Sequence, residues 1–200
     1  MNEYALGLSL LDFVPNLAFL AGSVFLVLLA MLRTDRTCQI ATIAGSALVF
    51  LGGTLKATWK LLYTVGVGDY TLLSELQFPL HAPGFMLLLV GVVCLARQER
   101  KTRHAELVGM AVWKIPLLAV MTISSLGVQG ILSYLAFRRR AHVAGVLYVT
   151  AIVCMLSMAG MASAEQSVGQ QWLEESINSA GQIAYAVASY LLYRKIKANG

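Results

Sequence analysis

Charged residues are scarce in this chain, and their scarcity decides its class. Only 12% of the 200 residues are charged and 58% are hydrophobic, whereas about 25% of the residues in soluble domains are charged. A soluble fold of this length has too little interior to bury so much apolar surface, so lipid must cover part of it. We therefore expect an integral membrane protein rather than one ordinary soluble domain.

Catalytic and cofactor motifs are also missing. The sequence has no HExxH motif, no glycine-rich phosphate loop and no hydrolase-type order of serine, histidine and acid. A haem held by two histidines would need both inside the membrane, and only His81 is placed for that. The three cysteines contain no CxxC pair, so we expect small buried hydrophobes rather than a zinc site or a disulfide framework. We expect no catalytic residue, no metal and no cofactor.

Lysine and arginine are absent ahead of the first apolar run. A secretory signal begins with positive charge, so we expect a retained first helix. Elsewhere the basic residues gather at the ends of apolar runs, which is typical of headgroup contact and topology control. No basic stripe interleaved with aromatics remains, so we expect membrane lipids as partners and no nucleic acid. The basic clusters are residues 33–36, 97–103, 138–140 and 194–197.

Six apolar runs are long enough to cross a bilayer, because a transmembrane helix needs about 20 mostly apolar residues. We predict an all-α fold, a polytopic integral membrane protein with six transmembrane helices in one domain over residues 1–200. The plasma (cytoplasmic) membrane is the expected location. The predicted spans are residues 14–32, 40–63, 78–96, 112–137, 143–164 and 177–193. Residues 105–137 are long for one crossing, and a surface helix or re-entrant piece is the alternative there.

The two halves of the chain, residues 12–104 and 112–197, follow one pattern. The first helix of each half has a proline at its start, Pro15 or Pro116, and arginines at its end. A second helix then leads to an acidic loop, and a third carries a glycine near its start, Gly84 or Gly181. We predict a three-plus-three inverted repeat, as in many transporters. In inverted halves, two basic clusters lie on each side of the membrane and their charges nearly balance. Only the first helix then favours one orientation, with the N-terminus outside.

Polar residues recur at helical spacing on three of the predicted spans. They either form interhelical hydrogen bonds that hold the bundle together or line a shared polar cavity. The stripes are Thr42, Gly45, Gly52, Lys56, Lys60 and Tyr63 on the second span, Thr122, Ser125, Gln129 and Ser133 on the fourth, and Asn178, Gln182, Tyr185, Ser189 and Tyr193 on the sixth.

Lys56 and Lys60 lie about one helical turn apart, with Trp59 and Tyr63 beside them. A charge at membrane depth is costly and often marks a functional site. Near a helix end, however, a lysine can extend so that its ammonium reaches the headgroups. We expect Lys60 to do so, and the deeper Lys56 either to do the same or to bind an anion or a partner inside. Trp59 and Tyr63 are typical of an interfacial aromatic belt.

If the chain has six spans, several acidic residues lie on the same side of the membrane as Lys56 and Lys60. They form either a solvated loop or partners for the lysines across the mouth of the bundle, where paired carboxylates can relay protons. We favour Glu75 and Glu174 because each precedes the third helix of its half. The acids on this side are Asp69, Glu75, Glu165, Glu174 and Glu175.

His81 lies between Pro79 and Pro83, where backbone hydrogen bonds are lost. A broken helix with an ionisable residue is typical of a transport site. A polar entry turn at the interface is the alternative.

These features favour a carrier or channel for a small anionic or amphipathic molecule. Two alternatives remain open: a non-catalytic accessory or scaffold subunit in a homo- or hetero-oligomer, and a membrane-embedded lipid-modifying enzyme. Polar stripes that converge on a cavity would indicate a carrier, and stripes that are packed shut would indicate a scaffold. Two carboxylates within reach of one substrate bond would indicate an enzyme. The candidate ligand-binding residues are Lys56, Lys60, Tyr63, Glu75, His81, Gln129, Glu174 and Gln182.

Overall fold

The computed structural model describes residues 6–98, 115–161 and 167–198. Secondary structure in this part of the chain is entirely helical, which confirms the predicted all-α class. The helices are α1 (Leu6–Leu11), α2 (Phe13–Arg33), α3 (Arg36–Thr64), α4 (Thr71–Glu75), α5 (Gln77–Gln98), α6 (Ile115–Arg138), α7 (His142–Met161) and α8 (Val168–Ala198).

Six of these helices are long, and each contains most or all of one predicted span. The segments Leu6–Arg33, Arg36–Thr64, Thr71–Arg97 and Val120–Arg138 are long and apolar enough to cross a membrane, while His142–Met158 is apolar but shorter. The main difference is α8, which begins at Val168 although residues 168–176 were expected to form a loop. This extension places the carboxylates of that stretch on a helix face.

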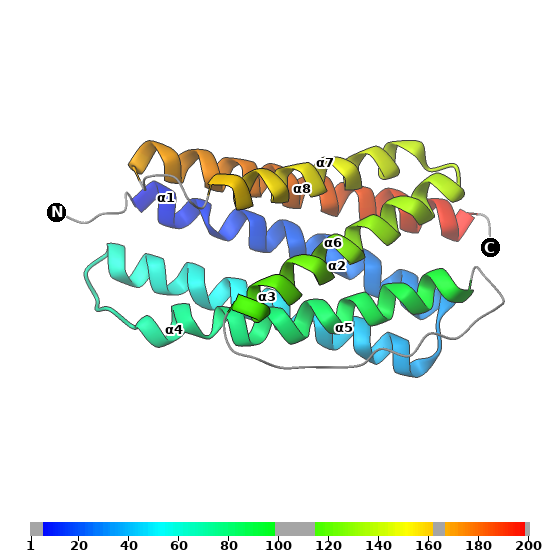
Figure 1. The fold of residues 1–200 in the computed structure, drawn as a ribbon, viewed down its shortest axis with the longest axis horizontal. Helices are drawn as coiled ribbons and strands as arrows, with labels where there is room; N and C mark the ends of the chain where they lie inside the picture. Colours follow the sequence, from blue (N-terminus) through cyan, green and yellow to red (C-terminus); the bar gives the residue numbers. More distant parts are fainter. Residues whose placement is uncertain (1–5, 99–114, 162–166, 199–200) are drawn as a thin grey trace.

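The six long helices form a closed ring in chain order (Figure 1). α2 packs on α3, α3 on α5, α5 on α6, α6 on α7, α7 on α8, and α8 returns to α2. The apolar core fills this ring and takes side chains from every long helix, among them Leu26, Val49, Leu88, Leu132 and Tyr148. Each long helix therefore has an inner face for the core and an outer face for the surroundings.

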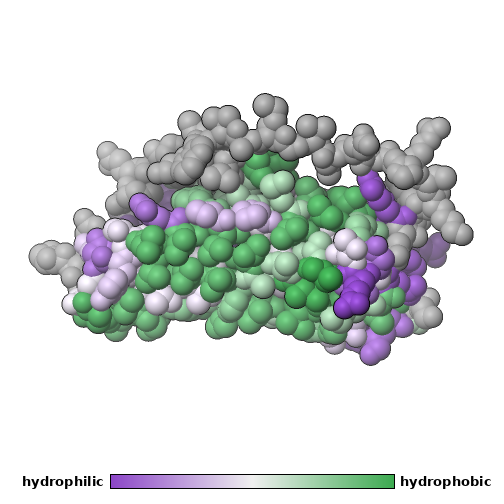
Figure 2. Space-filling view, turned by 90° about the horizontal axis from the view of Figure 1, so that it is seen from below, coloured by the Kyte–Doolittle hydropathy of each residue, from purple (hydrophilic) through white to green (hydrophobic). Residues whose placement is uncertain are grey.

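The outer surface is apolar along most of its length. In Figure 2, apolar side chains cover the middle of the face shown, and the most hydrophilic residues gather toward its two ends. Leu17, Ile123 and Val153 are each more than half exposed. A monomeric soluble protein rarely exposes so large an apolar surface, whereas lipid tails cover it readily. The chain is a multi-pass helical membrane protein.

α3 and α5 approach closely because glycines line their contact. A Cβ atom on Gly45 would lie 2.7 Å from both the carbonyl oxygen of Gly84 and the amide nitrogen of Leu88. A Cβ atom on Gly91 would collide with the hydroxyl of Thr42. Small residues allow helix backbones to approach within a membrane, where close packing drives association. Thr42 and Gly45 of the predicted polar stripe therefore serve helix packing.

Cys38 at the start of α3 and Cys94 near the end of α5 form a disulfide, with their Cα atoms 6.2 Å apart. The prediction that the cysteines are only small buried hydrophobes is wrong for this pair. The two residues are 56 positions apart, and only the antiparallel packing of α3 and α5 brings them together. Cys154 on α7 is a free thiol.

The two halves run in the same direction, so the predicted inversion is wrong. α5 and α6 run from the same end of the bundle toward the other, so these two helices are parallel (Figure 1). The helices α2, α5, α6 and α8 point toward one end of the bundle, and α3 and α7 point toward the other (Figure 1). Residues 99–114, between α5 and α6, lie outside the described part. The repeat itself stays a prediction.

The basic residues that end α2, α5, α6 and α8 consequently lie at one end of the bundle. Arg33 of α2 donates a hydrogen bond of 3.3 Å to the carbonyl oxygen of Ile196 in α8. The expected balance of basic charge between the two sides of the membrane depended on inversion, so it does not hold. The positive-inside rule then predicts a cytoplasmic basic end and an N-terminus outside. The Cys38–Cys94 disulfide at the same end argues for the reverse, because cytosolic thiols are kept reduced.

The disulfide predicts how many thiols the purified protein offers to alkylation. Unfolded without reductant, the chain should take up one maleimide, at Cys154, and after reduction it should take up three. Mass spectrometry of the intact chain measures this number. Cys38→Ser provides the control, because it should free Cys94 and give two maleimides without reductant. Three maleimides on the unreduced wild-type chain would contradict the Cys38–Cys94 bond.

The glycine contact predicts a position-dependent effect of one added methyl group. Gly45→Ala should lower the free energy of unfolding by about 1–3 kcal/mol, because its Cβ meets backbone atoms that cannot rotate away. Gly130→Ala is the matched control, because a Cβ at Gly130 would have no neighbour within 4 Å. Thermal unfolding in detergent measures both variants. Equal midpoints would show that α3 and α5 are not in close contact at Gly45.

Candidate functional site

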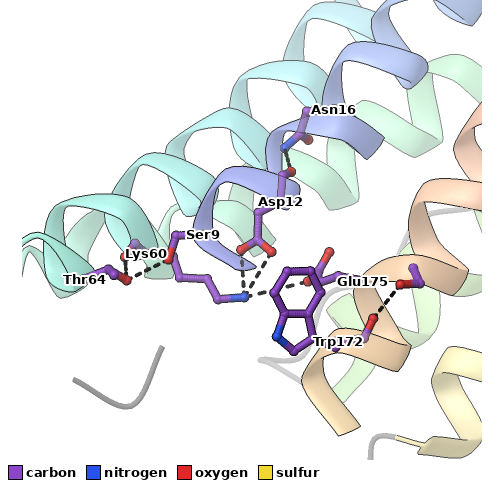
Figure 3. A network of polar contacts seen from close by, with 8 residues as sticks. Ser9, Asp12, Asn16, Lys60, Thr64, Trp172 and Glu175 are labelled. Carbon is purple, nitrogen blue, oxygen red and sulfur yellow. Dashed lines mark hydrogen bonds and ion pairs between the residues drawn. The ribbon is translucent and has the colours of Figure 1, made fainter. Parts of the chain in front are cut away.

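A buried ion pair lies at the end of the bundle opposite the basic residues (Figure 3). The Lys60 ammonium of α3 is 3.0 Å from Oδ1 and 2.8 Å from Oδ2 of Asp12, at the junction of α1 and α2. The Lys60 and Asp12 side chains are only 9% and 7% exposed. A third helix, α8, contributes Glu175, whose Oε1 lies 4.0 Å from the same ammonium. We call Asp12, Lys60 and Glu175 the charge cluster.

Local hydrogen bonds fix the elements that carry the charge cluster. The Asn16 side chain donates to the carbonyl oxygen of Asp12 at 2.9 Å, within the first turn of α2. The hydroxyls of Ser9 in α1 and Thr64 in α3 form a hydrogen bond of 2.6 Å. Thr64 also donates to the carbonyl oxygen of Lys60. The short helix α1 is thus attached to α3 about one turn from the ion pair on both helices.

The indole of Trp172 in α8 covers part of the cluster. Its ring packs against α1, where a Cβ atom on Gly7 would lie 3.4 Å from the ring. Figure 3 shows the indole beside the Glu175 side chain. Trp172 thus places the start of α8 against α1 close to the cluster.

The structure corrects the expected position of one of the two lysines. Lys60 was expected to reach the headgroups, but it is buried in the ion pair. For Lys56 two alternatives were open, and its exposed side chain fits a lysine that reaches the headgroups rather than one that binds inside. Residues four apart differ in direction by about 40° around a helix of 3.6 residues per turn, and here only Lys60 faces the α1–α2 junction. Sequence reasoning missed this because it assigned no partner to Asp12.

The favoured acids Glu75 and Glu174 are not the residues that reach Lys60. Glu75 ends α4 and is exposed. Glu174 is half-buried and lies 3.5 Å from the amide nitrogen of Gln170, one turn earlier on α8. Glu175, its neighbour, points toward the cluster. The helical extension of α8 decides between the two acids, since adjacent residues point about 100° apart.

Tyr63 and the aromatic residue beside it lie near the end of α3. The rings of Trp59 and Tyr63 stack with their centroids 6.1 Å apart. The Trp59 indole nitrogen donates a hydrogen bond of 2.8 Å to Asp69. Amphipathic rings with one polar contact are suited to a membrane interface, which agrees with the predicted aromatic belt. Glu165 lies outside the described residues.

His81 is buried between α5 and α3, where its Nε2 donates to the carbonyl oxygen of Val49 at 2.9 Å. The prediction of a broken helix is wrong, because α5 continues from Gln77 to Gln98 with Pro83 inside it. The bond joins two packed helices, so His81 serves the α3–α5 contact.

Gln129 of α6 and Gln182 of α8 meet at the centre of the ring. Both line a cavity of about 20 Å³, with Phe85 and Tyr185 nearby, and a second cavity of about 40 Å³, which also contacts Cys154. A water molecule needs at least roughly 10–15 Å³ of such volume, so each cavity has room for only a few waters at most. We call this pair of cavities the central site.

A side-chain oxygen of the central site, Oε1 of Gln129, lacks a hydrogen-bond partner among the described residues. Gln129 is only 8% exposed, and its Oε1 accepts no hydrogen bond from the described residues. Its neighbours along α6 are bonded across the helix interface. Ser125 donates to Met155 Sδ at 3.2 Å and Ser133 to the carbonyl oxygen of Gly145 at 3.1 Å. Interhelical bonding therefore accounts for these two serines and leaves Gln129 unexplained.

The fold and the two sites define an all-α, multi-pass membrane protein with charges buried at one end and amides at its centre. No protein-family model, no curated protein and no solved structure matches the chain. The function is therefore argued from the charge cluster and the central site.

The ion pair predicts that the two lysines differ strongly in their effect on stability. Lys60→Met should lower the free energy of unfolding by about 3–5 kcal/mol, because Asp12 would remain buried without its partner. Lys56→Met, at an exposed position one turn away, should change it by no more than about 0.5 kcal/mol. Thermal unfolding in detergent compares them. Equal effects of the two substitutions would contradict the ion pair.

Proposed function

We propose that the protein is a carrier for a small amphipathic molecule, which binds at the central site between Gln129 and Gln182. The observation that carries this proposal is the buried Oε1 of Gln129, which accepts no hydrogen bond from the described residues although it lines a cavity. A buried polar atom without a partner is costly, and a ligand with a donor group would satisfy it.

The lining of the central site favours an amphipathic substrate over an anionic one. Gln129, Gln182 and Asn178 offer amide donors and acceptors, and Phe85 and Met158 offer apolar surface. An anion would need a free cation, but Lys60 is paired with Asp12 and Lys56 is exposed. Binding sites for small molecules commonly combine apolar walls with a few oriented polar groups.

The small cavity volume argues against an open channel, and it fits a carrier only in a closed state; the accessory-subunit alternative also has a closed interior. The cavities of about 20 and 40 Å³ admit water-sized molecules only. A carrier alternates between closed and open states by moving one group of helices against another. The three stripes converge only in part, because α3 directs its small residues to α5 while α6 and α8 direct their amides to the centre.

The carrier function predicts that water reaches the central site during the transport cycle. Cys154 lines this site, so a charged, water-soluble methanethiosulfonate should modify it in proteoliposomes. The matched control is Val153→Cys in a Cys154→Ser background, because Val153 is 55% exposed on the outer surface, where lipid would shield a thiol. Mass spectrometry over time gives the two rates, and we expect Cys154 to react faster.

A second substitution links the reaction to the amides. Gln129→Leu should slow the modification of Cys154, because it removes a polar group that draws water or substrate into the site. A Cys154 rate no higher than that of Val153→Cys would overturn the carrier function. It would favour the accessory-subunit alternative, in which the interior stays closed.

A further inference from the structure

The charge cluster contains one more carboxylate than ammonium among its described members. Asp12 engages Lys60 with both carboxylate oxygens, at 3.0 and 2.8 Å. Glu175 lies 4.0 Å from the ammonium, which is beyond hydrogen-bond distance. Its side chain is only 18% exposed. An ionised Glu175 would therefore be a buried charge whose nearest cation is already used by Asp12.

The surroundings of the partly buried Glu175 carboxyl group raise its pKa. Glu175 precedes the apolar part of α8, residues 177–193. Burial raises the pKa of its carboxyl group, the nearby Asp12 carboxylate raises this pKa further, and the ammonium groups of Lys60 and Lys56 lower it. Loss of water around a carboxylate and the approach of a second carboxylate both disfavour its charged form.

The ionisable surroundings of Glu175 come from each element that packs near it. The junction of α1 and α2 provides one carboxylate, α3 provides two ammonium groups, α8 adds a neighbouring acid, and α7 has a thiol deeper in the bundle. In that order, these groups are Asp12, Lys56, Lys60, Glu174 and Cys154.

Glu175 and the central site are connected through one helix. Asn178 and Gln182 follow Glu175 by three and seven residues on α8, which places all three on one side of the helix. Gln182 is about 10 Å from Glu175 along the axis at 1.5 Å per residue. Both Asn178 and Gln182 line the larger cavity. A displacement of the first turns of α8 would therefore move residues of the central site.

We propose that Glu175 is a proton-binding residue that couples proton release to opening of the carrier. When the Glu175 carboxyl group is protonated, Lys60 holds Asp12 and the start of α8 stays against α1. Loss of the proton to water at this end leaves two carboxylates in competition for one ammonium. The uncompensated charge draws the start of α8 toward water, and Gln182 moves with it. This inference rests on the carrier function proposed above.

Infrared spectroscopy tests proton binding without any substrate. In wild-type protein in lipid, the carbonyl stretch of a protonated carboxyl group should persist to a higher pH than for an ordinary glutamic acid, because the pKa of Glu175 is raised, and it should disappear as the pH is raised further. Glu175→Gln should lack the band, and Glu174→Gln, the adjacent acid outside the cluster, should keep it. Absence of the band from the wild-type protein, or its persistence in Glu175→Gln, would overturn the proposal.

Modification of Cys154 tests the coupling in the same preparations. The rate rises with pH in every variant because the thiolate is the reacting species. We expect a steeper rise in the wild-type and Glu174→Gln proteins, and in Glu175→Gln only the rise due to the thiolate. Identical pH profiles in all three proteins, with Cys154 still reactive, would overturn proton coupling and leave the carrier function standing. An unreactive Cys154 in all three would overturn the carrier function itself, whereas the infrared band would still report proton binding.

Discussion

The ammonium of Lys60 imposes the strongest single constraint on this structure. A charge inside a helical bundle is tolerated only if an opposite charge or several hydrogen bonds compensate its loss of water. Asp12 provides that compensation through both carboxylate oxygens. Because Asp12 lies between α1 and α2, the ion pair fixes how the first two helices approach α3. Trp172 and Glu175 then bring the start of α8 to the same place.

Most of the fold could be predicted from the sequence because apolar runs in a membrane must be helical. Backbone groups in lipid need internal partners, so a run such as residues 78–96 can hardly be anything but a helix. The helix ends followed from charges such as Arg33 and Arg138, which end α2 and α6. The start of α8 was missed because residues 168–176 are polar, and there tertiary contact of Trp172 with α1 outweighs composition.

The relative direction of the two halves could not be predicted by counting spans. Counting spans gives inverted halves only if consecutive spans alternate in direction, and α5 and α6 run parallel (Figure 1). The basic residues gave a sign of this, because inversion would divide Arg97 and Arg138 between opposite sides of the membrane against the positive-inside rule. The charge distribution was thus better guidance than the span count. The pairing of Cys38 with Cys94 had no comparable signal, since it depends on the register between two helices.

For the candidate site, residue type was predictable and rotational position was not. The sequence indicated that Gln129 and Gln182 carry polar groups into the bundle, and each of them is at least partly buried. It could not distinguish Lys56 from Lys60 or Glu174 from Glu175. Such choices depend on rotations of about 40° and 100° around a helix axis, which tertiary packing sets.

The helix α8 links both sites, and its packing explains how a change at one could reach the other. It lies between α2 and α7 in the ring and touches each through a glycine. A Cβ atom on Gly22 of α2 would collide with the Tyr185 ring, and one on Gly181 would lie 2.9 Å from Cβ of Cys154 in α7. The charge cluster holds one end of α8, and Gln182 lies farther along the same helix. Under the proposed coupling, a change in charge at Glu175 would therefore be carried to the central site by this helix.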